Sequence, residues 1–189
     1  GVKALEGKVG TVFDLGGQFA KWIKGGNEGN PADPVIDDFA LNGLCAAGSG
    51  VFLEQQAARL QLSVQTLGEI ALQAKKSARI AGRCSVFAKS DMIHLQQKGT
   101  PVDEIAYGLC LALSRTFLSS IPELSQLPLP ITIIGGGGEN PGLIRAFKEL
   151  LDSGPGQLLV PEHQLFACAI GTAIEARSSS QKSLSDWHS

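Results

Sequence analysis

The sequence predicts an α/β fold, and three features of the 189-residue chain support this prediction. Two short apolar runs, at residues 11–15 and 131–134, each end in consecutive glycines, as buried strands that lead into tight turns do. Between and after these runs, apolar residues recur at helical spacing. The 23 glycines gather at a few tight clusters, which is typical of loops that approach a ligand closely.

The first third of the chain is predicted to contain a hairpin followed by two helices. Residues 11–15 form the first strand, and 21–23 are its returning partner. The Gly-, Asn- and Pro-rich stretch 25–34 reads as a mobile loop. One helix is expected over 46–60, beginning directly after Cys45, and a second over 63–74 with Ser63 as its N-cap.

The middle of the chain is predicted to be mainly helical. Residues 85–88 favour a brief strand or turn, after which Asp91 caps a short helix over 92–97. A long amphipathic helix then runs through 105–118, with its apolar residues along one stripe. This segment is expected to supply much of the core.

The last third of the chain returns to the alternation of strand and helix. Residues 131–134 suit a strand buried on both faces. A helix follows from Asn140 to Leu151, and Pro141 stands in its first turn, where a backbone N–H would have no partner within the helix. A last strand near 158–160 precedes a helix over 164–177. The serine-rich tail 178–189 is expected to be disordered.

Composition excludes several classes of protein. The net charge of -2 and pI near 5.9 provide no basic field for nucleic acid. No apolar run approaches the roughly 18 residues of a membrane span, and no secretory signal precedes the first strand, so a cytoplasmic protein is expected. Four cysteines without close pairing then favour reduced thiols over disulfides.

Two glycine turns, at residues 14–18 and 135–138, are the candidate ligand site. Each frees backbone N–H groups and removes side-chain bulk, so that a phosphate can approach the main chain. The helix after the second turn would add the partial positive charge of its N-terminus. Asp14 is suited to hold a hydrated Mg²⁺ on a nucleotide phosphate, although a turn-forming aspartate is the simpler alternative. Neither turn matches a P-loop.

Five segments in order resemble a known family. They are Val12 to Gln18 (VFDLGGQ), Asn42 to Glu54 (NGLCAAGSGVFLE), Cys84 to Ser90 (CSVFAKS), Gly135 to Gly138 with Asn140 to Gly142 (GGGG and NPG), and Val160 to His163 with Ala169 to Ala173 (VPEH and AIGTA). Together they resemble the BadF/BadG/BcrA/BcrD type of ATPase, which includes the activators of 2-hydroxyacyl-CoA dehydratases and the ATPase subunits of benzoyl-CoA reductases. Five ordered matches are a far more specific signal than one motif.

The resemblance implies a fold and a function. The fold is the ribonuclease H-like half of an actin-like ATPase, with residues 1–177 as its C-terminal subdomain. The implied function is ATP-dependent delivery of low-potential electrons to a 2-hydroxyacyl-CoA dehydratase or benzoyl-CoA reductase-like partner, with ferredoxin or flavodoxin as the donor. One [4Fe–4S] cluster is shared across a homodimer in that family. ATPase activity is expected only together with the N-terminal half.

The resemblance also assigns roles to individual residues. Asp14 and Gln18 would act on the terminal phosphates and Mg²⁺, and Cys45 and Cys84 would ligate the cluster. The residues expected to contact the nucleotide are Gly16, Gly17, Lys21, Gly135, Gly136, Gly137, Asn140 and Pro141. Cys110 and Cys168 match no motif and are expected in the core.

Two departures from the family pattern leave alternatives open. Phe19 stands where the family has Asp, and Lys89 where it has Glu, so two carboxylates are missing. A sugar-kinase-like phosphotransferase shares the nucleotide glycines without needing paired cysteines. A degenerate, non-catalytic interaction module of the same fold is the other alternative.

Overall fold

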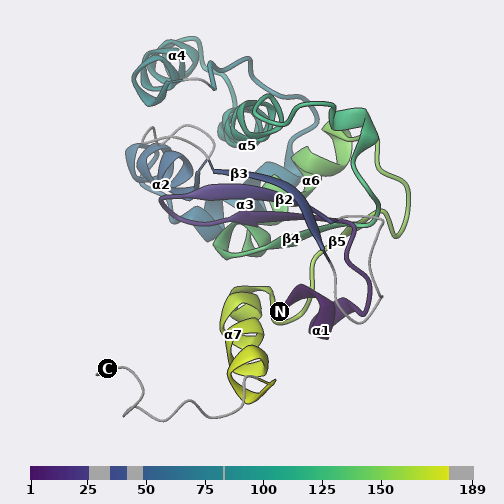
Figure 1. The fold of residues 1–189 in the computed structure, drawn as a ribbon. Helices are drawn as coiled ribbons and strands as arrows, with labels where there is room; N and C mark the ends of the chain where they lie inside the picture. The colour runs from purple at the N-terminus through teal and green to yellow at the C-terminus, as the bar shows by residue number, and fades with distance from the viewer. Residues whose placement is uncertain (26–34, 42–48, 83, 179–189) are drawn as a thin grey trace.

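A five-stranded mixed sheet organises the protein (Figure 1). The computed structural model describes residues 1–25, 35–41, 49–82 and 84–178. The strands are β1 (Thr11–Leu15), β2 (Ala20–Gly25), β3 (Ile36–Leu41), β4 (Ile131–Ile134) and β5 (Leu158–Leu159), in the spatial order β3-β2-β1-β4-β5. β1, β2 and β3 pair antiparallel, whereas β4 lies parallel to both β1 and β5.

Helices cover both faces of this sheet. The α-helices are α1 (Val2–Glu6), α2 (Gly50–Arg59), α3 (Val64–Gln73), α4 (Ser85–Gln97), α5 (Val102–Leu118), α6 (Pro141–Leu150) and α7 (Ala167–Ser178). Three short 3₁₀ helices are η1 (Leu124–Gln126), η2 (Gly136–Glu139) and η3 (Gln164–Phe166). The expected hairpin, the buried strand at 131–134 and the helices begun by Ser63 and Asn140 are confirmed.

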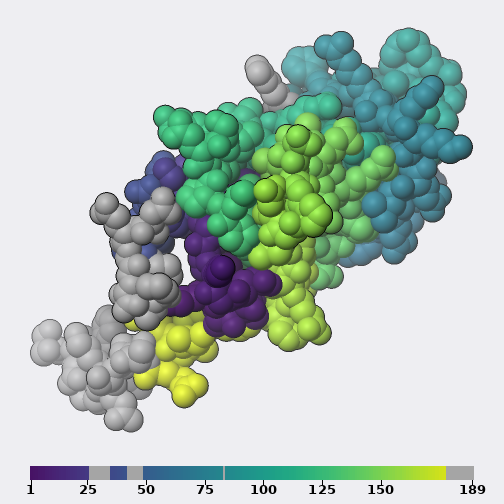
Figure 2. Space-filling model, turned by 90° about the vertical axis from the view of Figure 1, so that its right-hand side faces the viewer, coloured from purple at the N-terminus to yellow at the C-terminus, as the bar shows by residue number. Residues whose placement is uncertain are grey.

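Alternation along the strands divides the interior into two cores. Phe13 and Trp22 face the larger core, in which α5 is buried around most of its circumference rather than along one stripe. Val12 and Ile134 face a smaller core with Val2 and Ala167. Figure 2 shows α1, in purple, lying against α7, in yellow, on this second side. Because side chains alternate between faces, Asp14 lies on the α7 side.

The segment after Cys84 differs from its prediction. Residues 85–88 are not a strand or turn but the first turn of α4, and Asp91 lies inside this helix, where it accepts a hydrogen bond from the Ala81 N–H at 2.8 Å. Val86 and Phe87 favoured a strand, yet both are 65% exposed. The helix buries Ala88 and Met92 instead, which are spaced one turn apart.

The first helix after Cys45 also begins later than predicted. α2 begins at Gly50, because Ser49 has an extended backbone and acts as the N-cap. Residues 42–48, which include Cys45, lie outside the described part of the chain, as do most of the predicted mobile loop and residues 179–189 of the predicted tail.

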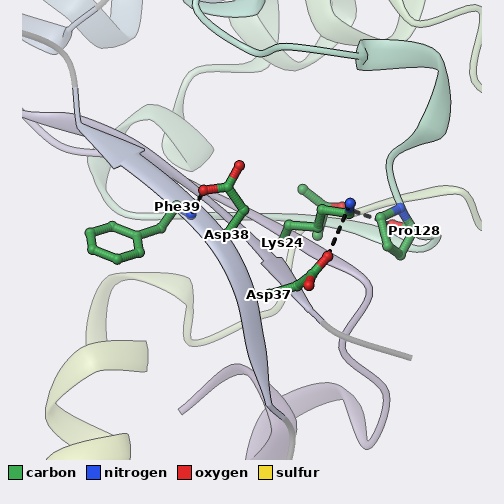
Figure 3. A network of polar contacts seen from close by, with 6 residues as sticks. Lys24, Asp37, Asp38, Phe39 and Pro128 are labelled. Atoms are coloured by element: carbon green, nitrogen blue, oxygen red, sulfur yellow. Dashed lines mark hydrogen bonds and ion pairs between the residues drawn. The ribbon is translucent and has the colours of Figure 1, made fainter. Parts of the chain in front are cut away.

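Two elements, α1 and β3, were not expected from the pattern. β3 is an edge strand whose sequence IDDFAL lacks a regular apolar alternation, and five of its six residues are exposed. Lys24 of β2 forms an ion pair with Asp37 at 3.0 Å, and Asp38 accepts a hydrogen bond from the Phe39 N–H (Figure 3). Pairing with β2 and local polar contacts therefore hold this strand in place.

Among the described residues, none of the helices combines the length and the apolar character that crossing a bilayer demands.

Three aromatic rings at the centre of the larger core offer a test of the packing. The Phe147 ring centroid lies 5.8 Å from both Phe13 and Phe117, and Phe147 is fully buried. We expect Phe147→Ala to lower the free energy of unfolding by about 3–5 kcal/mol, because it removes buried area and leaves a cavity. Chemical denaturation measures this loss.

A matched control is Phe166→Ala, since the Phe166 ring is 61% exposed. This change should stay within about 0.5 kcal/mol of the parent protein. Equal losses for the two variants would contradict the assignment of the core.

Candidate functional site

The two predicted glycine turns meet at one edge of the sheet. Because β1 and β4 are parallel neighbours, their carboxyl ends lie side by side, and each runs directly into its glycines. A Cβ atom at Gly137 would lie 2.5 Å from the Cβ of Leu15, closer than two side chains can approach. The glycines of the second turn are therefore required by the contact with the first.

Asp14 lies between the turns and is 7% exposed. Its Oδ2 accepts from the Lys21 ammonium at 2.7 Å, and the two residues are direct partners in the β1–β2 pairing. That hydrogen bond is the main cause of the raised pKa of Lys21, so the ammonium stays charged at neutral pH. Gly135 has φ +81°, and a Cβ there would lie 2.8 Å from Asp14 Oδ1. A side chain at position 135 would displace the carboxylate.

Cys168 corrects one prediction, because it is exposed and does not lie in the core. Its Sγ is 4.0 Å from Asp14 Oδ2, the same oxygen that binds Lys21. α7 begins at Ala167, the residue before Cys168, and places Cys168 on the face of the sheet on which Asp14 lies. Cys110 matches its prediction, since it is fully buried in the larger core.

The N-terminus of α2 is bound to the first glycine turn. The N–H of Gly50 donates to the Gly16 carbonyl at 2.9 Å, and the N–H of Val51 donates to the Gly17 carbonyl at 2.7 Å. A Cβ at Gly50 would lie 3.1 Å from the Gly17 Cα, so this position also favours glycine. α2 therefore begins at the turn that follows Asp14.

Asn140 holds the second turn to the helical layer. Its Oδ1 accepts from the Leu143 N–H at 2.9 Å as the cap of α6, and its Nδ2 donates to the Val64 carbonyl at 3.0 Å. The oxygen and the nitrogen of the Asn140 side-chain amide thus both form hydrogen bonds within the protein. Asn140 lies at the predicted site, but its geometry indicates a role in positioning rather than direct contact with a ligand.

Two cavities flank the second turn. The smaller, of about 160 Å³, lies between the turns and is lined by Gly16, Gly17, Gly136, Gly137 and Asn140, together with Glu54 of α2 and an apolar floor. The larger, of about 620 Å³, is lined by Gly138, Pro141 and Arg145, with five other residues. Arg145 is held rigidly, since its Nη1 donates to the carbonyls of Ala71 and Ala74 and its guanidinium lies 3.9 Å from the Tyr107 ring centroid.

Two of the remaining predicted residues, Gln18 and Cys84, are described but line neither cavity. Gln18 is exposed and does not line either cavity. Cys84 is partly buried and is the N-cap of α4, while Cys45 falls outside the described residues. Phe19 is 44% exposed.

Sequence reasoning missed three residues of the site, Gly50, Glu54 and Gln164. Gln164 binds the second turn, because its carbonyl accepts from the Gly135 N–H at 3.2 Å and its side-chain amide donates to Glu139. The spacing of Gly50 and Glu54, one helical turn apart, was a usable signal for a shared helix face.

Comparison with known proteins identifies the family. The sequence profile of the BadF/BadG/BcrA/BcrD ATPase family matches residues 1–176. The chain belongs to this family. Its fold is that of the actin-like ATPases.

The most similar proteins include dehydratase activators. The chain is 27% identical over 183 residues to the 2-hydroxyisocaproyl-CoA dehydratase activator of Clostridioides difficile, covering 97% of the chain and 65% of the relative. It is 30% identical over 182 residues to the activator of lactoyl-CoA dehydratase of Anaerotignum propionicum, covering 96% and 67%. The chain thus spans about two thirds of the length of these relatives.

Solved structures agree in fold. Component A of the (R)-2-hydroxyglutaryl-CoA dehydratase of Acidaminococcus fermentans superposes with a TM-score of 0.78 at 27% identity, covering 92% of this chain and 63% of that one. The Clostridium difficile activator, solved with bound ADPNP, superposes with a TM-score of 0.76 at 24% identity, covering 96% and 67%.

The contrast between Cys168 and Cys110 predicts their reactivity. Complete burial raises the pKa of the Cys110 thiol to about 12, so it is both inaccessible and protonated, whereas Cys168 is open to solvent. Cys168→Ser should lower the number of fast-reacting thiols by about one, and Cys110→Ala should leave it unchanged. Titration with Ellman's reagent, with and without denaturant, measures both; a fast-reacting Cys110 would contradict the packing described.

Proposed function

We propose that this chain is the nucleotide- and cluster-binding part of an ATP-dependent activator that delivers electrons to a 2-hydroxyacyl-CoA dehydratase or a benzoyl-CoA reductase-like enzyme. The observation that carries the proposal is the junction of the two glycine turns around the Asp14–Lys21 pair, with α2 bound directly to the first turn. Membership of the family and similarity to dehydratase activators support the choice of activity. ATP hydrolysis is proposed for the chain together with the further part that its relatives possess.

The first turn is suited to the phosphates. Gly17 is exposed, and a Cβ atom there would meet nothing within 4 Å, so the backbone is open to a ligand. Asp14 supplies carboxylate oxygens for the water shell of Mg²⁺, and the Lys21 ammonium beside it supplies positive charge for phosphate oxygens. Gln18, exposed at the tip of this turn, is the proposed residue for orienting the attacking water.

The second turn is suited to the adenosine. Gly136 and Gly137 line the smaller cavity, and Pro141 lines the larger one on the far side of the turn. The larger cavity, at about 620 Å³, has room for a purine base. Arg145, fixed by the α3 carbonyls, presents a flat cationic group at its wall, and such a group stacks favourably on a heteroaromatic ring.

Cys84 fits the role of a cluster ligand. Its thiol is free and only partly buried, and it caps the 13-residue helix α4, whose N-terminal partial charge stabilises an anionic sulfur ligand. Val86 and Phe87, both 65% exposed, lie beside it in α4 and provide apolar surface for a second subunit. Cys45 is the proposed second ligand. A [4Fe–4S] cluster supplies one-electron transfer at low potential when bound, and two cysteines per chain require a homodimer to complete it.

The hydrogen bonds between α2 and the first turn provide a mechanical connection. A ligand that shifts the Gly16 and Gly17 backbone also shifts the N-terminus of α2, because Gly50 and Val51 donate to those carbonyls. Cys45 precedes α2 by five residues. We therefore propose that the state of the nucleotide is transmitted to the cluster ligands through α2, with a ferredoxin or flavodoxin as electron donor.

Asp14→Asn tests the phosphate and metal assignment. The substitution keeps the shape of the side chain but removes its charge, so we expect the contribution of Mg²⁺ to ATP binding to fall by about tenfold or more. Saturation-transfer NMR at millimolar nucleotide detects weak complexes. Comparing ATP binding with and without Mg²⁺ by this method measures the contribution of the metal. Asp37→Asn is the matched control, because Asp37 is also paired with a lysine but lies on β3. An unchanged Mg²⁺ dependence in Asp14→Asn would overturn the assignment.

Iron content after anaerobic reconstitution tests the cluster. We expect about two irons per chain, a broad visible absorbance, and a dimer by light scattering. Cys84→Ala and Cys45→Ala should lose the iron and the absorbance, while Cys110→Ala, which removes a buried thiol, should keep them.

Iron content and phosphate release together separate the rival functions. A sugar-kinase-like phosphotransferase of this fold takes up no iron but binds ATP. A degenerate interaction module, which the loss of carboxylates at Phe19 and Lys89 favours, releases no phosphate even when joined to the part of its relatives that this chain does not span.

A further inference from the structure

One stretch of the chain has a concentration of positive charge that the glycine turns do not use. Residues 75–98 contain six lysines and arginines and one acidic residue, Asp91, whereas the rest of the chain has ten basic and seventeen acidic residues. The stretch is therefore a local positive region on a chain whose net charge is -2. Figure 2 shows this blue and teal part of the chain at the end of the molecule away from α7, in yellow.

Backbone contacts fix the course of the first part of this stretch along α5. The N–H of Ala78 donates to the Glu104 carbonyl at 2.9 Å, and a Cβ atom at Gly82 would lie 2.3 Å from the carbonyl oxygen of Ala112. The stretch thus runs in the same direction as α5, from the first turn of that helix toward its C-terminal half. Ala78 is buried in this contact, whereas Arg79 is exposed.

α4 lies against the same stretch and runs in the opposite direction. Asp91 of α4 accepts a hydrogen bond from the Ala81 N–H at 2.8 Å, so its carboxylate is held at the backbone. Three residues separate Lys98, the C-cap of α4, from the start of α5. Lys98 therefore lies near the N-terminus of α5, at the end of the stretch where Lys75 and Lys76 precede Ala78.

Five exposed basic side chains lie along this course and are called the basic strip: Lys75, Lys76, Arg79, Lys98 and Arg115. Arg115 lies at the far end, where it lines a cavity of about 310 Å³ together with Ile80 and Gly82. None of the five forms an ion pair with a residue that the structure describes. Cys84, the proposed cluster ligand, follows Gly82 by two residues, so the strip ends beside it.

The acidic residues of α4 and α5 offset only part of this charge. Asp91 is engaged by the backbone, and Asp103 and Glu104 are half-buried in the first turn of α5, at the end far from Cys84. Lys89, exposed in α4, adds a further positive charge at a position where the family has a glutamate. The surroundings of Cys84 are thus more positive in this chain than the family pattern implies.

A row of exposed lysines and arginines suits a brief encounter steered by charge. Stable protein interfaces depend on buried aromatic and aliphatic anchors, and the strip has none. Opposite charges instead speed association and make it sensitive to salt. Electron-transfer complexes are typically of this kind, because they are transient and bury little area.

We propose that the basic strip is the docking surface for a small acidic electron-carrier protein. The proposal rests on the proposed function, in which Cys84 is a cluster ligand. A cluster held by four thiolates is negatively charged, and so is the reduced centre of the carrier, so the two repel each other. Cationic side chains beside Cys84 offset this repulsion. Nucleic acid is a poorer fit, because the acidic remainder of the chain repels an extended phosphate backbone.

Calorimetric titration with a bacterial ferredoxin that contains two [4Fe–4S] clusters tests the strip. We expect the dissociation constant to rise about tenfold between about 50 and 200 mM sodium chloride, since salt screens the exposed charges. The double variant Lys76→Glu with Arg79→Glu should weaken binding about tenfold or more at the lower salt concentration. The neutral double variant Lys76→Gln with Arg79→Gln should give an intermediate loss.

The matched control reverses two exposed charges at the other end of the molecule. Lys8 follows α1 and Arg177 lies in α7, and both are exposed. Lys8→Glu with Arg177→Glu changes the net charge by the same amount and should leave ferredoxin binding within about twofold of the parent protein. Equal losses in the two charge-reversal variants would show that only net charge matters and would overturn the proposal.

Three further outcomes decide against the strip. Binding that does not change with salt, or no binding of either this ferredoxin or a flavodoxin, would overturn the proposal. Tighter binding of a short DNA duplex than of ferredoxin, lost in Lys76→Glu with Arg79→Glu, would assign the strip to nucleic acid instead.

Iron content separates the failure of the proposal from the failure of the proposed function. All of these variants should take up as much iron as the parent protein after anaerobic reconstitution, because none of them changes a proposed ligand. Normal iron uptake with unchanged ferredoxin binding in the strip variants would overturn the docking surface and leave the proposed function intact. A parent protein that takes up no iron would remove the cluster from the proposed function, and the docking proposal with it.

Discussion

The parallel pairing of β1 with β4 is the constraint on which the candidate site depends. It places two glycine turns, separated by about 120 residues in the sequence, at the same edge of the sheet. Gly135 and Gly137 then approach Asp14 and Leu15 so closely that a side chain at either glycine would part the turns. The carboxylate, its lysine and the open backbone come together because of this contact rather than through any local motif.

The helical layer makes the site continuous with the rest of the molecule. α2 begins on the first turn through two backbone hydrogen bonds, and Asn140 ties the second turn to α3. The same helices pack their apolar faces on α5 and the aromatic centre of the core. The two glycine turns are therefore connected to the buried helical layer through backbone and side-chain hydrogen bonds.

Charge is distributed unevenly around the site. Asp14 is balanced by Lys21, and Cys168 lies close to the same carboxylate oxygen, whereas Glu54 has no partner among the described residues. The balanced pair suits a metal-bound anion.

The sequence by itself determined four of the five strands, the glycine turns, the caps at Ser63 and Asn140 and the family, because these depend on local periodicity, backbone freedom and ordered motifs. It misjudged residues 85–88, where β-branched and aromatic side chains favoured a strand, although Ala88 and Met92 packing on the core makes the segment helical. It also placed Cys168 in the core, since an apolar helical stripe does not reveal which face the sheet will cover. Only the tertiary structure could decide that Cys168 meets Asp14, that α2 begins on the first glycine turn, and that Glu54 lines the smaller cavity. Each of these depends on contacts between segments that are distant along the chain, which the pairing of β1 with β4 and the packing of α2 and α7 bring together.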